Sequence, residues 1–185
     1  MIDLITLDEC NAEPKAELID ALAKITFNAF ADTAPTWLPT LEHARAQVLS
    51  AAAGDGQARV AMAGERAVGW IGLKPGKRVW EIHPIAVDPT QQGLGVGRLL
   101  VDAAVRSARE AGALTLFAST SDEIGSTSLF EADLFDAPWQ AMRDLRVTGP
   151  SPVSFWQKVG FTVVGVLPDA EGTGKPSIQL ARTLA

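Results

Sequence analysis

The stretch from Trp80 to Ser119 constrains the fold of this chain more than any other part of the sequence. It begins with an apolar run that favours a strand, passes through a glycine-rich turn into a helical pattern, and ends in a second apolar run. The helical pattern begins near Gly97, and the turn before it contains no lysine. Such a turn places bare backbone N–H groups and the positive end of a helix dipole at one point, which suits a phosphate or pyrophosphate. The sequence therefore predicts a strand–turn–helix–strand unit with an anion site at its turn.

Three glycines, Gly93, Gly95 and Gly97, leave room in this turn for a ligand to reach the backbone. A P-loop would need a lysine and then a serine or threonine after its last glycine, whereas Arg98 follows here. The dinucleotide fingerprint G-x-G-x-x-G differs in spacing, and no matching acidic residue lies in a following βαβ unit. The residues instead match Q-x-x-G-x-G, which begins at Gln92. An ordinary strand–helix turn is the alternative to an anion site.

The composition allows one domain with a sizeable core, because the chain has 185 residues and 47% of them are apolar. The single cysteine, Cys10, cannot form an internal disulfide, which favours a reducing compartment. The N-terminus does not resemble a signal peptide and no run reaches the length of a membrane span, so we expect a cytoplasmic protein without a membrane partner. The formal net charge of −6 argues against nucleic acid as a partner and is compatible with a cationic substrate.

Hydrophobic periodicity predicts strands over Ile2–Leu7, Gln57–Ala63, Ala67–Leu73, Val79–Val87, Leu114–Ser119, Phe161–Leu167 and Ile178–Leu184. It predicts helices over Lys15–Phe30, Leu41–Ala53 and Gly97–Ala111, and a short helix from the prolines at 150 and 152 through Val159. The segment Thr120–Thr148 is expected to be loop with some helix. Pro84 cannot donate to a ladder, so a bulge or an edge is expected within its strand. This order predicts an α+β, or mixed α/β, domain with a central, mostly antiparallel sheet.

Two motifs resemble those of the GCN5-related N-acetyltransferase (GNAT) family. The Q-x-x-G-x-G turn resembles the pyrophosphate-binding motif with which this family holds acetyl-CoA. The run S-F-W-Q-K-V-G-F at Ser154–Phe161 is similar to the family's helix-then-strand signature. The order of the predicted elements is also similar to the GNAT topology, a twisted sheet with splayed strands flanked by helices. The resemblance implies one N-acetyltransferase domain over residues 1–185, and family analogy suggests a homodimer.

Roughly the C-terminal two thirds of the chain is similar to a subgroup of aminoglycoside 6′-N-acetyltransferases. The similarity lies in W-E-I-H-P-I-A-V at Trp80–Val87 and in the segment Phe155–Pro176, and it is weak before Val68. It implies acetyl-CoA as co-substrate, without a metal, in a V between the strands at 82–87 and 114–119. The residues implied to contact the cofactor are Ile85, Ala86, Val87, Gln92, Gly93, Leu94, Gly95, Val96, Gly97, Arg98 and Trp156.

Acetyl transfer to an amine needs a neutral amine, so a carboxylate that accepts its proton is expected nearby. Glu81 is the candidate base, because it lies on the strand expected to carry the thioester and shares a face with His83. The resemblance implies that Glu81 binds the amine and that His83 orders the amine or a bridging water. A backbone N–H near Ile85 is the expected oxyanion donor. A surface carboxylate paired with a lysine, and a histidine packed beside a bulge, are the alternatives for these two side chains.

Carboxylates gather after the strand on the other side of the V, and we expect Asp122 and Glu123 to contact a cationic substrate. A solvated acidic loop is the alternative. The loop Ala31–Pro39, with Trp37, occupies the place where the family varies with its substrate, so it either covers the acceptor site or anchors the core.

One departure from the family concerns Trp156, where many members have a tyrosine that protonates the leaving thiolate. This chain contains no tyrosine, and an indole N–H can donate a hydrogen bond but is not a useful acid. Trp156 therefore either donates to the sulfur, while water supplies the proton, or only packs in the core.

The leading hypothesis is acetyl-CoA-dependent transfer to a primary amine of a cationic small molecule, with an aminoglycoside as the best single guess. A polyamine, an amino acid derivative or a protein amine is the alternative acceptor. A catalytically silent acyl-CoA-binding module is the alternative from another class, and the missing tyrosine is its only support.

Overall fold

The computed structural model describes residues 2–7 and 12–185, and Cys10 lies outside them. The strands are β1 (Asp3–Thr6), β2 (Gln57–Ala63), β3 (Arg66–Lys74), β4 (Val79–Val87), β5 (Thr115–Ser121), β6 (Thr162–Leu167) and β7 (Ser177–Thr183). The helices are α1 (Ala12–Phe30), α2 (Leu41–Ala51), α3 (Val96–Glu110), α4 (Pro138–Arg143) and α5 (Pro152–Lys158), with a 3₁₀ turn, η2, at Pro89–Gln91.

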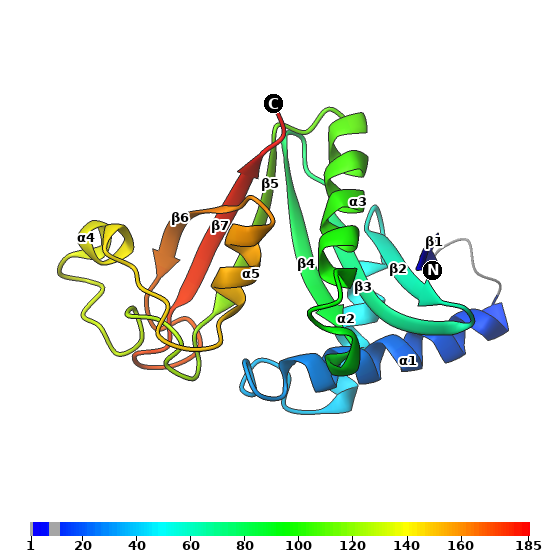
Figure 1. The fold of residues 1–185 in the computed structure, drawn as a ribbon, viewed down its shortest axis with the longest axis horizontal. Helices are drawn as coiled ribbons and strands as arrows, with labels where there is room; N and C mark the ends of the chain where they lie inside the picture. Colours follow the sequence, from blue (N-terminus) through cyan, green and yellow to red (C-terminus); the bar gives the residue numbers. More distant parts are fainter. Residues whose placement is uncertain (1, 8–11) are drawn as a thin grey trace.

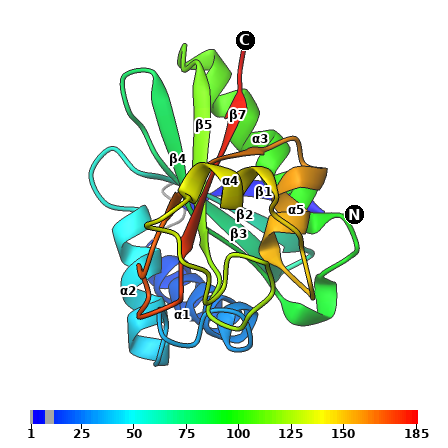
Figure 2. The ribbon, with the colours of Figure 1, turned by 90° about the vertical axis from the view of Figure 1, so that its left-hand side faces the viewer.

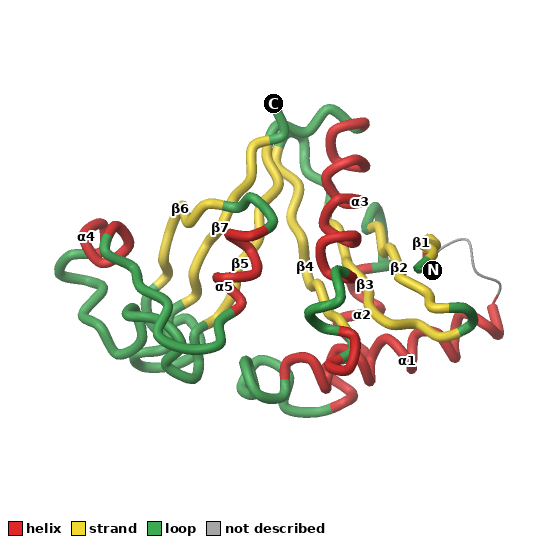
Figure 3. The backbone as a smooth tube through the Cα atoms, viewed as in Figure 1, coloured by secondary structure: helices red, strands yellow, loops and turns green. Residues whose placement is uncertain are grey.

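All strands join one sheet in the order β1-β2-β3-β4-β5-β7-β6, and every neighbouring pair except β4–β5 is antiparallel. The predicted α+β class and mostly antiparallel sheet are therefore confirmed. The parallel pair is short, because Val79–Glu81 of β4 pair with Thr115–Phe117 of β5 and the pairing ends there. Beyond it the strands diverge, and the sheet splays into an N-terminal arm (β1–β4) and a C-terminal arm (β5–β7), as Figures 1 and 3 show.

Two apolar clusters hold the helices to the sheet. On one face of the N-terminal arm, Leu22 of α1 and Val48 of α2 pack against Trp70 of β3. On the other face, helices α3 and α5 share a larger cluster with β3, β4, β5 and β7, and this cluster includes Leu100 and Trp156. Figure 2 shows the two pairs of helices on opposite sides of the sheet. The larger cluster spans both arms, so the splayed sheet still has a continuous core.

The central strand β4 contains the bulge that Pro84 predicts. Leu73 of β3 lies opposite Ile82, whereas Ile71 lies opposite Ile85, so β4 has one extra residue between these positions. The extra residue changes which side chains face α3. Before it, Trp80 and Ile82 pack on the α3 side, and after it Ile85 and Val87 do so, while Ala86 joins the α1 side.

The expected elements and the observed ones differ mainly at their ends. Helix α3 begins at Val96, one residue before the expected start, and α2 ends at Ala51, before the expected end at Ala53. In the segment Thr120–Thr148 the expected helical part is α4, which is six residues long. Among the described residues, no helix combines the length and the apolar character needed to cross a bilayer.

Candidate active site

The turn after β4 is held in place by polar contacts that precede its glycines. Asp88 accepts hydrogen bonds from the Thr90 amide at 2.9 Å and the Thr90 hydroxyl at 2.7 Å, and it pairs with Arg66. The hydroxyl of Thr90, followed by its amide and by Arg66, lowers the pKa of Asp88 below its ordinary value. The Gln92 side chain donates to the carbonyl of Val87 at 3.2 Å. These contacts fix the end of β4 and the start of the turn.

The glycines at 93 and 95 make the open part of the turn. Gly93 has φ +75° and Gly95 has φ +92°, a region that favours glycine, and nothing lies within 4 Å of a Cβ built at either position. Gly95 is the N-cap of α3, and the first helical hydrogen bond runs from the Leu99 amide to the Gly95 carbonyl at 3.0 Å. The amides of the first helical turn therefore have no acceptor within the helix, and the two glycines before it leave the adjoining space open.

Gly97 and Arg98, in the first turn of α3, have contacts of their own that involve side chains. A Cβ built on Gly97 would lie 2.9 Å from the Phe155 ring, so its small size serves the packing of α3 against α5. The Arg98 guanidinium donates to the carbonyl of Lys158 at 2.8 Å. The sequence predicts that both contact the cofactor, and the structure shows that they also join α3 to α5. These contacts leave the backbone amides of both residues uncommitted, so their contact with the cofactor stays a prediction.

Glu81 and His83 lie together on the face of β4 away from α3. Oε1 of Glu81 is 3.8 Å from Nδ1 of His83, and Nε2 of His83 is 3.1 Å from Oε1 of Gln47 on α2. The ring of His83 also meets the edge of Trp37, with centroids 5.6 Å apart. Burial, followed by the nearby Lys74 ammonium, lowers the pKa of His83 from its ordinary value near 6.5, so the ring is neutral at pH 7.

The contact of His83 with Gln47 fits one tautomer of the ring. An amide oxygen only accepts hydrogen bonds, so with Gln47 oriented as it is, Nε2 of His83 carries the hydrogen. Nδ1 is then a lone-pair acceptor that faces the carboxylate of Glu81, which is also an acceptor. The two atoms cannot share a hydrogen of their own, and a donor such as an amine or a water would satisfy both. Nothing in the sequence around Gln47 indicates this role.

The two buried acidic residues after β5 differ in their surroundings. Asp122 is 1% exposed, and its two oxygens accept hydrogen bonds from the amides and the hydroxyls of Ser126 and Thr127. This network accounts for its burial and holds the loop together, and the contact of Asp122 with a substrate stays a prediction. Glu123 is 5% exposed, and its Oε2 accepts from the amide of Thr36 at 2.8 Å. Thr36 belongs to the loop Ala31–Pro39, whose Trp37 touches His83.

Trp156 lies on α5 and is 4% exposed. Its ring meets those of Phe155 and Phe161 at centroid distances of 5.2 and 4.9 Å. No hydrogen bond of its indole N–H to another described residue is present. The ring is thus anchored in the larger apolar cluster, and its one donor remains available.

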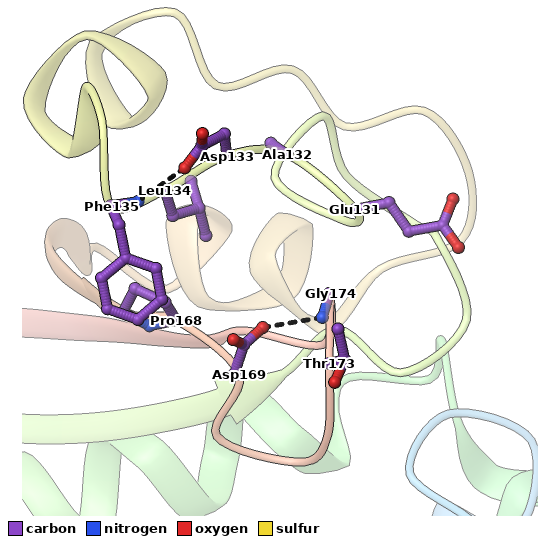
Figure 4. Close-up of a pocket in the computed structure, with 9 residues that line it drawn as sticks. All are labelled: Glu131, Ala132, Asp133, Leu134, Phe135, Pro168, Asp169, Thr173 and Gly174. Atoms are coloured by element: carbon purple, nitrogen blue, oxygen red, sulfur yellow. Dashed lines mark hydrogen bonds between the residues drawn. The ribbon is translucent and has the colours of Figure 1, made fainter.

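A hollow of about 360 Å³ lies on the C-terminal arm, away from the residues discussed so far. Figure 4 shows its walls, in which Asp169 accepts a hydrogen bond from the Gly174 amide at 2.7 Å and Glu131 points away from Phe135. None of Glu81, His83 and the glycine turn contributes to it. Elsewhere among the described residues, no group of three or more His, Cys, Asp or Glu side chains has the arrangement of a metal site.

Comparison with solved structures places this fold among acetyltransferases. A crystal structure of an aminoglycoside 6′-N-acetyltransferase complexed with coenzyme A has a TM-score of 0.86 and 24% identity, over 99% of this chain and 97% of that one. The aminoglycoside 6′-N-acetyltransferase from Enterococcus faecium has a TM-score of 0.82 and 24% identity, over 100% and 97%. The ribosomal-protein-S18-alanine N-acetyltransferase from Escherichia coli has a TM-score of 0.66 and 14% identity, over 100% and 95%.

Comparison with families and with curated sequences gives one match. No curated protein sequence matches this chain. The model of the acetyltransferase (GNAT) family matches residues 19–134, a span that contains α2, the bulged strand β4, the glycine turn and β5. The chain therefore belongs to the GNAT family and is an N-acetyltransferase.

Proposed function

We propose that this enzyme transfers an acetyl group from acetyl-CoA to a primary amine of a cationic small molecule, with the 6′-amine of an aminoglycoside as the specific acceptor. The observation that carries the proposal is the pair of acceptor atoms on Glu81 and His83, 3.8 Å apart, on the strand whose end forms the open glycine turn. The high structural similarity to two aminoglycoside 6′-N-acetyltransferases supports the choice of acceptor.

The residues of the turn and of β4 fit the cofactor. The free amides near Gly93–Val96 suit a pyrophosphate, with the exposed Leu94 at the rim. Past Glu81, the edge of β4 that faces β5 has no strand partner, so the backbone at Ile85–Val87 can pair with the amides of the pantetheine. The cofactor would supply the activated acetyl group, and a main-chain N–H near Ile85 would stabilise the oxyanion.

Glu81 and His83 would prepare the amine. An alkylammonium that enters between them donates to the carboxylate of Glu81 and to Nδ1 of His83. Glu81 then accepts the proton, directly or through a water, and leaves a neutral nucleophile. His83 stays neutral because of its burial and the nearby Lys74, so it orients the amine without repelling it.

The leaving thiolate has no phenol to protonate it, because the chain contains no tyrosine. We propose that the indole N–H of Trp156 donates a hydrogen bond to the sulfur and that water supplies the proton. A thiol with a pKa of about 8.5 is a fair leaving group, so this arrangement is compatible with turnover.

The test compares acceptors side by side by measuring the CoA thiol released from acetyl-CoA. Kanamycin, spermidine and a peptide with an N-terminal alanine would be offered to the same preparation. Turnover with kanamycin well above the other two supports the proposal. Preference for spermidine would indicate a polyamine as the acceptor. Preference for the peptide would indicate a protein amine, in line with the structural similarity to the ribosomal-protein-S18-alanine enzyme. Tight CoA binding without turnover of any amine would indicate a silent acyl-CoA-binding module.

A further inference from the structure

Gln47 of helix α2 reaches the ring of His83 from outside the strand that carries it. The helix packs on the sheet through a stripe of buried side chains, Ala44, Val48 and Ala51. Gln47 lies beside this stripe, three residues after Ala44 and one before Val48, so the helix turns its half-buried side chain toward the sheet. There its Oε1 lies 3.1 Å from Nε2 of His83, which is hydrogen-bond distance. The packing of α2 therefore determines what the imidazole meets.

The two ring nitrogens of His83 have different surroundings. Nε2 is at hydrogen-bond distance from Gln47, whereas Nδ1 is 3.8 Å from Oε1 of Glu81, which is beyond that distance. A hydrogen on Nδ1 would draw the carboxylate into a shorter, charge-assisted bond. The distances therefore favour a hydrogen on Nε2, with the amide oxygen of Gln47 as its acceptor. Trp37 packs against the ring edge to face, so the imidazole is held from a second side.

The partner of Nε2 is neutral, and this affects the charge of the ring. Burial lowers the pKa of His83 most, followed by Lys74 of β3, whereas Glu81 of β4 raises it. The helix and the loop that contact the ring from other directions present neutral groups, the amide of Gln47 and the indole of Trp37. A carboxylate in place of this amide would stabilise the imidazolium, as the aspartate does in a Ser-His-Asp triad. A glutamine instead leaves the ring uncharged, with a lone pair on Nδ1.

We infer that Gln47 is a positioning residue that holds His83 in the neutral, Nε2-protonated form, with Nδ1 as an acceptor for the amine. The inference rests on the proposed function, and it gives the two groups of the site different tasks. His83 accepts a hydrogen bond from the amine and keeps it aligned, while the proton itself passes to Glu81. A ring with its hydrogen on Nδ1, or a charged ring, would have no lone pair on Nδ1 for the amine. Gln47 acts through the ring.

Nitrogen NMR of the histidine rings distinguishes the tautomers and needs no acceptor. The chain has two histidines, so the His43→Gln variant assigns the signals of His83. We expect the free protein at pH 7 to show a protonated Nε2 and an unprotonated Nδ1. Gln47→Met, which keeps the length of the side chain and removes the amide, should give a mixture of tautomers. Gln47→Glu should move the titration midpoint of the ring to higher pH, because a carboxylate replaces the neutral amide.

Kinetics with the amine that the wild type turns over best connect the ring to catalysis. Gln47→Met is expected to lower kcat/KM about 10-fold, because the amine loses an oriented acceptor. Gln47→Glu is expected to lower kcat/KM about 10- to 100-fold at pH 7, and its deficit relative to the wild type should shrink toward pH 9 as the ring loses its charge. The controls are Gln140→Met and Gln140→Glu, which make the same changes at an exposed glutamine of α4 and should leave kcat/KM within about twofold of the wild type.

The spectra and the kinetics together decide the inference. A protonated Nε2 in the wild type, mixed tautomers in Gln47→Met and a deficit in Gln47→Glu that shrinks with pH support it. A hydrogen on Nδ1 in the wild type, or an unchanged tautomer in Gln47→Met, would overturn it. So would wild-type kinetics in Gln47→Met, or an equal loss in both Gln47 variants at every pH, which would indicate packing alone. If no amine is turned over, the proposed function is wrong, and the spectra still decide whether Gln47 fixes the ring.

Discussion

Oε1 of Glu81 and Nδ1 of His83 lie 3.8 Å apart, and in the Nε2-protonated tautomer of His83 neither atom carries a hydrogen. This tautomer fits the contact with a third residue, Gln47, whose amide oxygen lies 3.1 Å from Nε2 of His83. A donor from outside the protein, such as an amine or a water, can bind both of these acceptor atoms. The predictions below test the proposed roles of the Glu81 carboxylate and of the neutral His83 ring.

The first prediction concerns Glu81→Gln. The substitution keeps the shape of the side chain and removes the proton acceptor, so kcat with the best acceptor is expected to fall about 10²- to 10⁴-fold. CoA affinity, measured by calorimetry, is expected to stay within about twofold, because the turn that suits the pyrophosphate lies beyond the end of β4. Glu65→Gln in the β2–β3 hairpin is the matched control, since Glu65 is exposed. Undiminished turnover in Glu81→Gln would remove this residue as the base.

The second prediction concerns the pH dependence of stability. Because burial and Lys74 lower the pKa of His83 below about 6.5, the unfolded chain takes up a proton at this residue before the folded one does. Its contribution to the free energy of unfolding is therefore complete above pH 6.5 and is lost as the pH falls toward the lowered pKa. Urea unfolding at pH 7 and pH 5 is expected to show a smaller loss in His83→Gln than in the wild type.

The control for that experiment is His43→Gln, which removes the exposed histidine of α2. It should keep the wild-type difference between the two pH values. Identical pH dependence in His83→Gln and the wild type would mean that the ring of His83 does not stay neutral in the folded protein.

At the level of elements, the bulge of β4 depends on the strand beside it. Gly72 of β3 lies opposite the extra residue, and a Cβ built there would be 2.5 Å from the carbonyl oxygen of His83. Only a glycine lets the two backbones approach this closely. The bulge therefore depends on Gly72 of β3 as well as on the extra residue of β4, and Gly72 helps to fix the position of His83.

The third prediction is that Gly72→Ala moves the bulge. Since the obstacle is backbone rather than a mobile side chain, the substitution is expected to lower the free energy of unfolding by about 1–3 kcal/mol, as overpacking does. It should also lower kcat, because His83 shifts with its carbonyl. Gly149→Ala is the control: nothing lies within 4 Å of its Cβ position and its φ is not in the left-handed region. Stability and kcat of Gly72→Ala equal to those of this control would contradict the account of the bulge.

Elements with a strong local pattern could be predicted from the sequence, and contacts between distant segments could not. The alternation of β4, the glycines before α3 and the proline within the strand indicate strand, turn, helix and bulge from residues close together in the chain. The contacts of Gln47 with His83, of Thr36 with Glu123 and of Arg98 with Lys158 have no local signal. The hydrogen bonds of Asp122 with Ser126 and Thr127 likewise appear only in the folded loop, and no sequence pattern indicates them.

At the scale of the whole molecule, the sheet is held together at its centre by a short parallel pair of β4 and β5. The arms are also linked through the larger apolar cluster and through Arg98, which binds the carbonyl of Lys158. Below the short pair, the inner edges of the arms have no strand partners for each other. A ligand that bridges this gap ties the arms together in a way that the protein alone does not.

The fourth prediction follows from that bridge. CoA at about 100 times its Kd is expected to stabilise the folded state by about 2.7 kcal/mol, which corresponds to a rise in Tm of about 5–10 °C for a chain of this size. Differential scanning fluorimetry with CoA, and with pantetheine as the control that lacks the pyrophosphate, measures this. The shift should be much smaller with pantetheine at the same concentration. Equal shifts would show that the glycine turn does not hold the pyrophosphate.

The extra residue of β4 determines to which face of the sheet the side chains before and after it point. A regular strand alternates strictly, so a side chain near its start and one near its end keep a fixed parity. The extra residue at His83–Pro84 breaks this alternation. Glu81 and His83 therefore point to one face of the sheet, whereas Ile85 and Val87 point to the other. Without the extra residue in the pairing, Ile85 and Val87 would share a face with Glu81 and His83. A single residue thus puts the proposed amine-binding side chains and the side chains after the bulge on opposite faces of the sheet.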